Sequence, residues 1–232
     1  MNTTLITGAN RGIGLELARQ YAADGWRVLA CSRHPEKSDG LNDLAAQYPG
    51  LVQVHPLDVT DLAQIDALSR TLANESVDLL INNAGVYPDA QFKGFGHTDY
   101  AQWMLAFQVN TMAPLKMAEA FVGQVRRSKL KVIATISSMM GSIDDNKSGG
   151  SYLYRSSKAA VNMVNRSLAL DLKGDGITAV VFNPGWVKTD MGGPNAVISV
   201  QESVTGLRKV IGKLMQADSG KFFDYDGREI AW

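Results

Sequence analysis

Apolar and polar positions follow two different periods along the chain. Short runs rich in β-branched and other apolar residues predict strands at residues 3–7, 27–31, 51–54, 77–81, 131–137 and 178–182. Most of the segments between these runs place apolar residues at helical spacing. Strands and helices that alternate in this way predict right-handed crossovers and a mostly parallel sheet with helices on both faces.

The helical periods can be assigned to ranges. They predict helices over 15–22, 62–73, 99–126, 152–172 and 200–214. Asp61 is the expected N-cap of the second helix, whose predicted apolar stripe consists of Leu62, Ile65, Leu68 and Leu72. A last strand is expected near Phe222 and Phe223, as the seventh strand of the sheet. Because no repeat and no Pro-, Gly- or Ser-rich linker divides the chain, we expect one doubly wound α/β domain over residues 1–232.

The composition argues against several classes of protein. Lys and Arg total 23 and Asp and Glu total 23, so the formal net charge of zero does not suit a nucleic-acid-binding protein. The single cysteine, Cys31, and three scattered histidines predict neither a disulfide framework nor a metal site. No apolar run reaches the roughly 18 residues of a membrane span, and no secretion signal is recognisable at the start. We therefore expect a cytoplasmic protein with no nucleic-acid or membrane partner.

A glycine-rich loop joins the first strand to the first helix. In an open parallel sheet, ligands bind at the carboxyl ends of the strands, which is where this loop lies. Gly8 permits a tight turn, Gly12 lets the backbone approach a pyrophosphate, and Gly14 lets helix and strand pack closely. A plain glycine turn is the alternative, but the position at the first strand-to-helix connection favours a dinucleotide site.

The end of the second strand bears on which dinucleotide is bound. Sites for NAD usually carry a carboxylate here, whereas this chain has Ser32 and Arg33, and Arg11 lies within the glycine loop. Guanidinium groups bind a 2′-phosphate well, so we predict NADP(H) in preference to NAD(H). The alternative is that Arg33 is only a solvated loop residue.

Two further strand ends carry weaker signals. Asp58 and Val59 follow the third strand and could contact an adenine ring, although Asp58 could equally form a turn before the next helix. Asn83, Ala84 and Gly85 follow the fourth strand, where small residues and amides let the backbone come close to a nucleotide.

The candidate chemistry lies at the start of the long helix after the fifth strand. Tyr154 and Lys158 are four residues apart and therefore share one helix face. A free tyrosine has a pKa of about 10, and a nearby ammonium is expected to lower it and make the phenol a usable proton donor or acceptor. Tyr152 has Ser156 at the same offset and is assigned to packing.

These motifs together resemble the short-chain dehydrogenase/reductase family, in order from residue 3 to about residue 191. Within that family the chain looks most like the C-factor and sniffer-type carbonyl reductases. The motifs are Thr7-Gly8-Ala9-Asn10-Arg11-Gly12-Ile13-Gly14, Asn82-Asn83-Ala84-Gly85, Asn110, Ser138, Tyr154-x-x-x-Lys158 and Asn183-Pro184-Gly185. The resemblance implies a Rossmann-type fold with a mostly parallel, seven-stranded sheet.

The resemblance also implies roles for four residues. Tyr154 would be the general acid that protonates a carbonyl oxygen, and Ser138, favoured over Ser137, would hydrogen-bond that oxygen. Lys158 would lower the pKa of Tyr154 and hold the nicotinamide ribose. Asn110 would anchor a water of a proton relay. The polar segment 144–150 sets Ser138 and Tyr154 16 positions apart, which is longer than the family's usual spacing.

After the sixth strand, the resemblance places a nicotinamide-side loop followed by a short substrate loop around 186–200. The implied cofactor-binding residues are Gly8, Asn10, Arg11, Gly12, Ile13, Gly14, Arg33, Asp58, Val59, Asn83, Ala84, Gly85, Tyr154, Lys158, Pro184, Gly185, Val187 and Thr189.

The leading hypothesis is an NADPH-dependent reductase acting on a small or medium-sized aldehyde or ketone. A binding or cell-signalling protein of the same fold with little turnover is the alternative. A sugar-nucleotide epimerase would need a larger C-terminal part than the 41 residues after Met191. By resemblance, the helices at 99–126 and 152–172 build a homodimer or homotetramer, with Ala159, Ala160, Met163, Val164 and Leu168 as the expected seam. The alternative is that this stripe packs on the sheet.

Overall fold

A computed structural model describes residues 1–91 and 94–232 and contains one seven-stranded sheet. The strand order is β3-β2-β1-β4-β5-β6-β7, and every neighbouring pair is parallel. The strands are β1 (Thr3–Thr7), β2 (Arg27–Ser32), β3 (Val52–Pro56), β4 (Leu79–Asn82), β5 (Val132–Ile136), β6 (Thr178–Asn183) and β7 (Phe222–Asp224). The predicted doubly wound, Rossmann-type domain with seven strands is confirmed.

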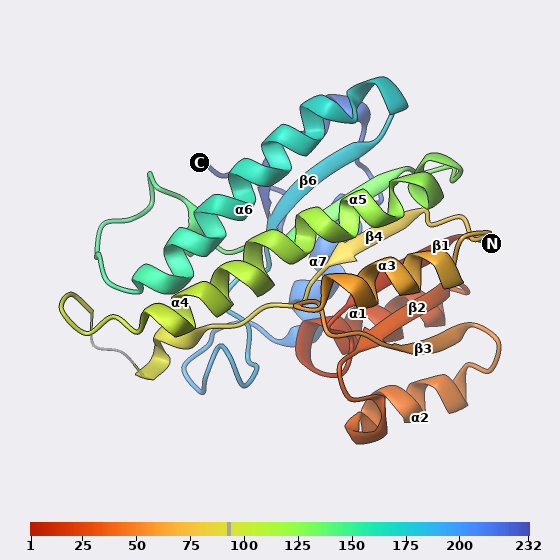
Figure 1. Ribbon diagram of the computed structural model, residues 1–232, viewed down its shortest axis with the longest axis horizontal. Coiled ribbons are helices and arrows are strands. Elements are labelled where there is room, and N and C mark those ends of the chain that lie inside the picture. The colour runs from red at the N-terminus through yellow and green to blue at the C-terminus, as the bar shows by residue number, and fades with distance from the viewer. Residues whose placement is uncertain (92–93) are drawn as a thin grey trace.

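Helices cover both faces of the sheet (Figure 1). They are α1 (Gly12–Ala23), α2 (Asp39–Gln47), α3 (Leu62–Thr71), α4 (Tyr100–Phe107), α5 (Ala113–Arg126), α6 (Tyr152–Asp171) and α7 (Val200–Ile211).

Two separate apolar clusters fill the space between helices and sheet. One contains Leu17, Leu41 and Leu207 of α1, α2 and α7, and the other contains side chains of α3, α5 and α6, among them Phe121. Because the central strands are covered on both sides, they are continuous apolar runs and do not alternate.

The structure differs from the sequence prediction in three elements. Helix α2 was not expected, because among its nine residues only Leu41 and Leu44 are buried apolar side chains. The predicted helix 99–126 is divided by a π-helical turn at Gln108–Met112. The apolar stripe of α3 omits Leu62, which is 42% exposed, although Asp61 caps this helix as predicted by accepting hydrogen bonds from Ala63 N and Gln64 N.

Parallel strands bring their carboxyl ends to one edge of the sheet. The loops after β1, β4, β5 and β6, four strands that are neighbours in the sheet, therefore lie side by side. In the part of the chain that the structure describes, no helix has both the length and the apolar character needed to cross a bilayer.

Candidate active site

The loop between β1 and α1 packs closely on the loop after β4. Gly8 has φ +66°, and a Cβ atom on Gly14 would lie 2.2 Å from the Gly8 carbonyl oxygen and 2.5 Å from Nδ2 of Asn83. Gly14 therefore permits the close packing that the sequence predicted. A Cβ atom on Gly12 would touch only the side chain of Thr189, at 3.3 Å, so this part of the backbone stays open to a ligand.

Asn83 and Thr7 hold these two loops together. The Asn83 amide donates hydrogen bonds to the carbonyl oxygens of Thr7, at 2.9 Å, and Gly8, at 3.0 Å. The Thr7 hydroxyl accepts from the main-chain N–H groups of Asn83, at 3.0 Å, and Ala84, at 3.1 Å. The Nδ2 group of Asn83 is thus committed to shaping the loop between β1 and α1.

The predicted cationic groups lie in different surroundings. Arg11 forms an ion pair with Asp190, with Nη1 and Oδ2 2.5 Å apart, and both side chains are largely exposed. Arg33 is exposed at the end of β2, close enough to Asp58 to influence it. The Ser32 hydroxyl is buried and lies 3.0 Å from the hydroxyl of Ser38, so it is not presented at the surface.

Asp58 forms the turn that was the alternative interpretation of this residue. One carboxylate oxygen accepts hydrogen bonds from the Thr60 N–H and hydroxyl, at 2.9 and 2.7 Å. Partial burial raises the pKa of Asp58, but the Thr60 hydrogen bonds and the charge of Arg33 outweigh it and leave the pKa lowered. Asp58 is therefore an anion close to Arg33.

Tyr154 and Lys158 lie together on the inner face of α6, and both are buried. The Lys158 ammonium lies 5.6 Å from the centroid of the Tyr154 ring. It donates a hydrogen bond of 2.9 Å to the carbonyl oxygen of Ile136 at the end of β5. The helix spacing of four residues therefore brings the two side chains together at the carboxyl edge of the sheet, as expected.

The electrostatics of this pair differ from the prediction. Burial raises the pKa of Tyr154 to about 12, and the Ser138 hydroxyl opposes this rise by hydrogen bonding to the phenol. Burial also lowers the pKa of Lys158 to about 8. The expected lowering of the Tyr154 pKa by Lys158 is wrong for this structure, because the loss of hydration at the phenol outweighs the other effects. At pH 7 the phenol keeps its proton.

Ser138 lies beside Tyr154 in spite of the long intervening segment. It is the residue before the short helix Met139–Gly141, and its hydroxyl accepts a hydrogen bond from Met140 N at 3.2 Å. Ser137 is buried instead, and its hydroxyl faces the Lys158 carbonyl oxygen at 3.5 Å. Residues 144–150 loop out and leave this arrangement intact.

Asn110 occupies the π-helical turn between α4 and α5. Its side-chain oxygen accepts from Val86 N at 2.9 Å, and its Nδ2 donates to the Val86 carbonyl and to the Ser157 hydroxyl, both at 3.0 Å. A Cβ atom on Gly85 would lie 3.4 Å from Oδ1 of Asn110 and 3.7 Å from Nζ of Lys158. Asn110 thus lies near Lys158 and connects the loop after β4 to α6.

The loop after β6 is folded back on itself. Gly185 has φ +82°, and a Cβ atom there would lie 2.5 Å from Cδ1 of Ile198, so this turn requires glycine. Val187 pairs with Ile198 through an isolated bridge, and the Thr189 hydroxyl donates to the Val187 carbonyl oxygen at 3.3 Å. Residues 184–198 therefore form an ordered wall next to the glycine loop.

Three residues to which the sequence analysis gave no role of their own support the site. The Asp89 carboxylate accepts hydrogen bonds from the first N–H groups of α6, and the Tyr87 ring packs edge-on against Tyr154, with centroids 4.8 Å apart. Asn183 accepts from Met139 N at 2.9 Å and donates to Asp224 at 2.8 Å, which fixes the segment that follows Ser138. The sequence signal for Asn183 was its place in the motif at the end of β6, whereas Tyr87 and Asp89 had only their position after β4.

Comparisons with known proteins show which sequences and structures the chain is similar to. A family model described as short chain dehydrogenase matches residues 2–197. The chain is 42% identical over 166 residues to C-signal of Myxococcus xanthus, an alignment that covers 72% of this chain and 99% of the relative.

Two solved structures are similar over the full chain. The NADPH-bound carbonyl reductase from chicken fatty liver has a TM-score of 0.93 and 34% identity, and 100% of this chain and 99% of that chain are covered. The carbonyl reductase Sniffer of D. melanogaster has a TM-score of 0.92 and 32% identity, with 100% of both chains covered.

Proposed function

Since the chain belongs to the short-chain dehydrogenase/reductase family of oxidoreductases, we propose that it reduces a small or medium-sized aldehyde or ketone with NADPH. The observation that carries this proposal is the neutral phenol of Tyr154, buried between Ser138 and Lys158 at the carboxyl edge of the sheet. A protonated phenol next to a second hydroxyl is the arrangement that a carbonyl oxygen needs to receive a proton. The NADPH-bound carbonyl reductase among the similar structures gives independent support.

The residues present suit a dinucleotide with a 2′-phosphate. The open backbone at Gly12 and the first N–H groups of α1 are suited to the pyrophosphate. Arg33 and Arg11 would hold the 2′-phosphate. Arg11 would be free to do so because breaking its exposed ion pair with Asp190 costs little free energy. Asp58 and Val59 would border the adenine, and Pro184, Gly185, Val187 and Thr189 the nicotinamide. When bound, NADPH would supply the hydride.

The chain's own residues would manage the proton. Tyr154 donates its phenolic proton to the substrate oxygen, while the Ser138 hydroxyl donates a hydrogen bond that orients the same oxygen. Lys158 holds a positive charge near the phenol and stabilises the phenolate left behind. Asn110 fixes the Val86 backbone and Ser157, and holds the water through which Tyr154 regains a proton.

The size of the substrate is limited by the loop around 186–200. Trp186 and Met191 in this loop are 53% and 48% exposed, so they are available to contact a substrate. We favour a small or medium-sized carbonyl compound as the substrate that this loop borders.

The test is a set of initial rates with NADPH and with NADH against aldehydes, ketones and quinones. Turnover that is clearly faster with NADPH supports both the reductase and the cofactor preference. Tight NADPH binding without turnover on any carbonyl contradicts the reductase and favours a binding or signalling protein. The similarity to C-signal is the observation in favour of that second candidate.

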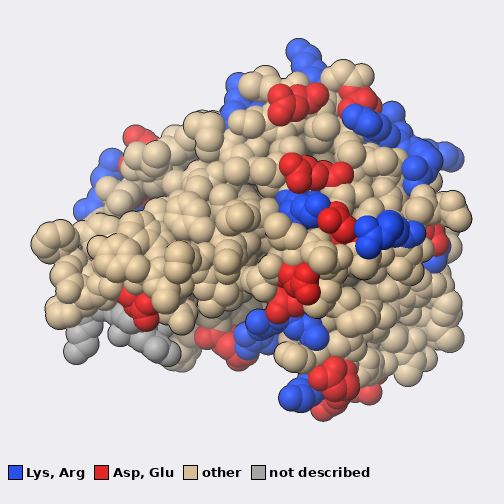
Figure 2. Space-filling view, viewed as in Figure 1, with Lys and Arg blue, Asp and Glu red and all other residues tan. Residues whose placement is uncertain are grey.

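A homo-oligomer formed through α4, α5 and α6 also belongs to this proposal. Figure 2 shows a broad surface with few charged side chains over α4 and α6. Exposed apolar side chains of this region are Tyr100, Met104, Met112, Met163 and Leu170. The residues of the seam predicted from the sequence do not share one environment. Leu168 is buried in the core, whereas Met163 is 67% exposed. Light scattering of wild type and Met163→Glu tests this interface, and an unchanged oligomer mass in the variant contradicts it.

A further inference from the structure

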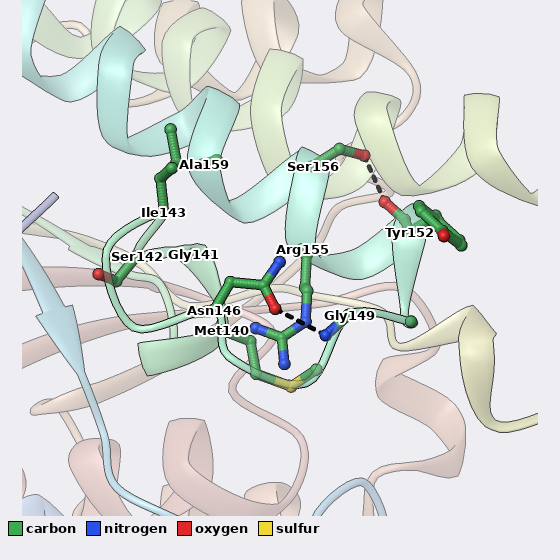
Figure 3. Close-up of a pocket in the computed structure, with 11 residues that line it drawn as sticks. Met140, Gly141, Ser142, Ile143, Asn146, Gly149, Tyr152, Arg155, Ser156 and Ala159 are labelled. Carbon is green, nitrogen blue, oxygen red and sulfur yellow. Dashed lines mark hydrogen bonds between the residues drawn. The ribbon is translucent and has the colours of Figure 1, made fainter. Parts of the chain in front are cut away.

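A second cavity lies behind α6, on the opposite side of the helix from Tyr154. It has a volume of about 240 Å³ and lies between the outer face of α6 and the segment 140–150 (Figure 3). Tyr152, Arg155, Ser156 and Ala159 line it, at spacings of three, four and seven residues that place them on one helix face. Tyr154 and Lys158 lie on the buried inner face, so this cavity is separate from the site of the proposed chemistry.

Arg155 points into this cavity, and most of its hydrogen-bonding capacity is unused (Figure 3). Its Nε and Nη1 atoms are buried and have no partner among the described residues. The third nitrogen, Nη2, donates a hydrogen bond of 3.0 Å to the Ser148 hydroxyl. Among the described residues, no carboxylate forms an ion pair with this guanidinium, and burial of unpaired N–H groups is costly unless a ligand supplies acceptors.

The two serine hydroxyls that line the cavity are already engaged. Ser156 donates to the Tyr152 carbonyl oxygen at 2.6 Å and lies 2.8 Å from the indole nitrogen of Trp103, which donates to it. Ser142 donates to the Ala231 carbonyl oxygen at 2.7 Å and accepts from Asp145 N at 3.1 Å. Among the described residues that line the cavity, Arg155 alone is charged, and it offers one positive charge.

Another part of the wall is apolar and partly accessible. Met140, Ile143, Tyr152 and Ala159 contribute apolar surface, and Ile143 and Tyr152 are 77% and 41% exposed at the outer border. The inner side of the cavity, at Gly141, is held closely against α6. Asn162 Nδ2 donates to the Gly141 carbonyl oxygen at 3.1 Å, and a Cβ atom on Gly141 would lie 3.0 Å from Lys158. One cationic donor at an apolar wall matches a ligand with one anionic group and an apolar body.

We propose that this cavity binds a small monocarboxylate, whose carboxylate pairs with the Arg155 guanidinium while its apolar chain contacts Met140, Ile143 and Ala159. A phosphate dianion fits less well, because a single guanidinium supplies the positive charge of the described lining, and Met140, Ile143 and Ala159 present apolar surface. This site does not depend on the proposed reductase activity.

The experiment is calorimetric titration of hexanoate into the full-length protein, with hexanamide as the uncharged analogue. The expected dissociation constant for a ligand of this size is on the order of 1 mM. Arg155→Gln should weaken hexanoate binding at least roughly tenfold, and hexanamide should bind the wild type at least about tenfold more weakly than hexanoate. Arg33→Gln, which removes the exposed guanidinium at the predicted dinucleotide site, should leave hexanoate affinity unchanged.

A second variant keeps the proposal testable if Arg155→Gln does not fold. Ala159→Leu fills the cavity from its apolar side, keeps the guanidinium, and should also abolish hexanoate binding. Unchanged affinity in either folded variant, an affinity reduced by Arg33→Gln, equal binding of hexanamide, or no saturable binding to the wild type would each overturn the proposal.

Discussion

The carboxylate of Asp89 accepts a hydrogen bond of 2.7 Å from the main-chain N–H of Tyr154. Its other oxygen accepts from Leu153 N at 3.2 Å, so one buried side chain caps the first turn of α6. The residue in the N-cap position, Ser151, has φ 46° and makes no capping hydrogen bond with its side chain. The position of the proposed acid thus depends on a residue that follows the loop after β4.

Replacement of Asp89 should therefore affect both stability and turnover. Asp89→Ala leaves two N–H groups without an acceptor and should lower the free energy of unfolding by about 1–2 kcal/mol. Because the first turn of α6 then shifts, kcat for carbonyl reduction should fall roughly tenfold to a hundredfold, with little change in the affinity for NADPH. Asp89→Asn keeps one acceptor and should recover part of the rate. Steady-state kinetics and denaturant unfolding measure these effects.

Asp99 provides the matched control for Asp89. It caps α4 in the same manner, by accepting from Ala101 N at 2.9 Å and Gln102 N at 3.1 Å, but it does not contact α6 through these bonds. Asp99→Ala should lose a similar amount of stability and keep the wild-type kcat. An equal loss of kcat in both variants would mean that the Asp89 effect is only a loss of stability.

Tyr154→Phe tests the proposed proton donor directly. Loss of the hydroxyl should lower kcat by about 10²–10⁴-fold, because the substrate oxygen no longer receives a proton, while NADPH affinity stays within a few-fold. Tyr152→Phe is the control, since this phenol is two positions away and 41% exposed. Wild-type turnover by Tyr154→Phe would contradict the assigned acid.

Local patterns predict the fold and most of the candidate site for a simple physical reason. Parallel strands bring their carboxyl ends to one edge, so Gly8, Asn83, Ser138 and Gly185 could be placed together from strand positions alone. Helix α2 was not predicted, because a short helix with two buried apolar residues gives almost no periodic signal.

Long-range contacts and burial could not be read from local patterns. The two hydrogen bonds of the Asp89 cap join residues that lie 64 and 65 positions apart in the sequence. No rule of local spacing predicts such a contact. The sequence suggested that Lys158 lowers the pKa of Tyr154, because spacing indicates proximity but not the loss of hydration. For the same reason, the unpaired guanidinium of Arg155 became visible only once the cavity around it was known.

The choice of dinucleotide should depend on Arg33. Arg33→Ala should weaken NADPH binding by about tenfold and leave NADH binding nearly unchanged, because only NADPH carries the 2′-phosphate that the guanidinium would contact. Fluorescence titration with each dinucleotide measures this difference. Arg19→Ala, which removes a half-exposed guanidinium on α1, serves as the control. Equal losses for both dinucleotides would reject contact with the phosphate.

The pH dependence of reduction should report the charge on Lys158. Burial lowers the pKa of this ammonium to about 8 and raises that of Tyr154 to about 12, so the acid stays protonated while the lysine loses its charge. Consequently kcat/KM should be constant below pH 8 and fall by about tenfold per pH unit above it. Lys158→Met should show a low rate without this inflection. A flat profile for the wild type up to pH 10 would contradict a role for the lysine charge.

The same buried ammonium should reduce the stability of the folded protein. Its one hydrogen bond, to the Ile136 carbonyl oxygen, does not replace its lost hydration, so Lys158→Met should raise the free energy of unfolding at pH 7 by about 1–3 kcal/mol. The pKa is lowered from 10.5 in the unfolded chain to about 8 in the folded chain, so between these values the unfolded chain binds more protons. Wild-type stability therefore rises through this window relative to the variant, and the advantage of Lys158→Met should shrink from pH 8 to 10.5. Denaturant unfolding of both proteins across this range measures the difference. A variant that is less stable than wild type at pH 7 would show that the ammonium is compensated by contacts other than Ile136.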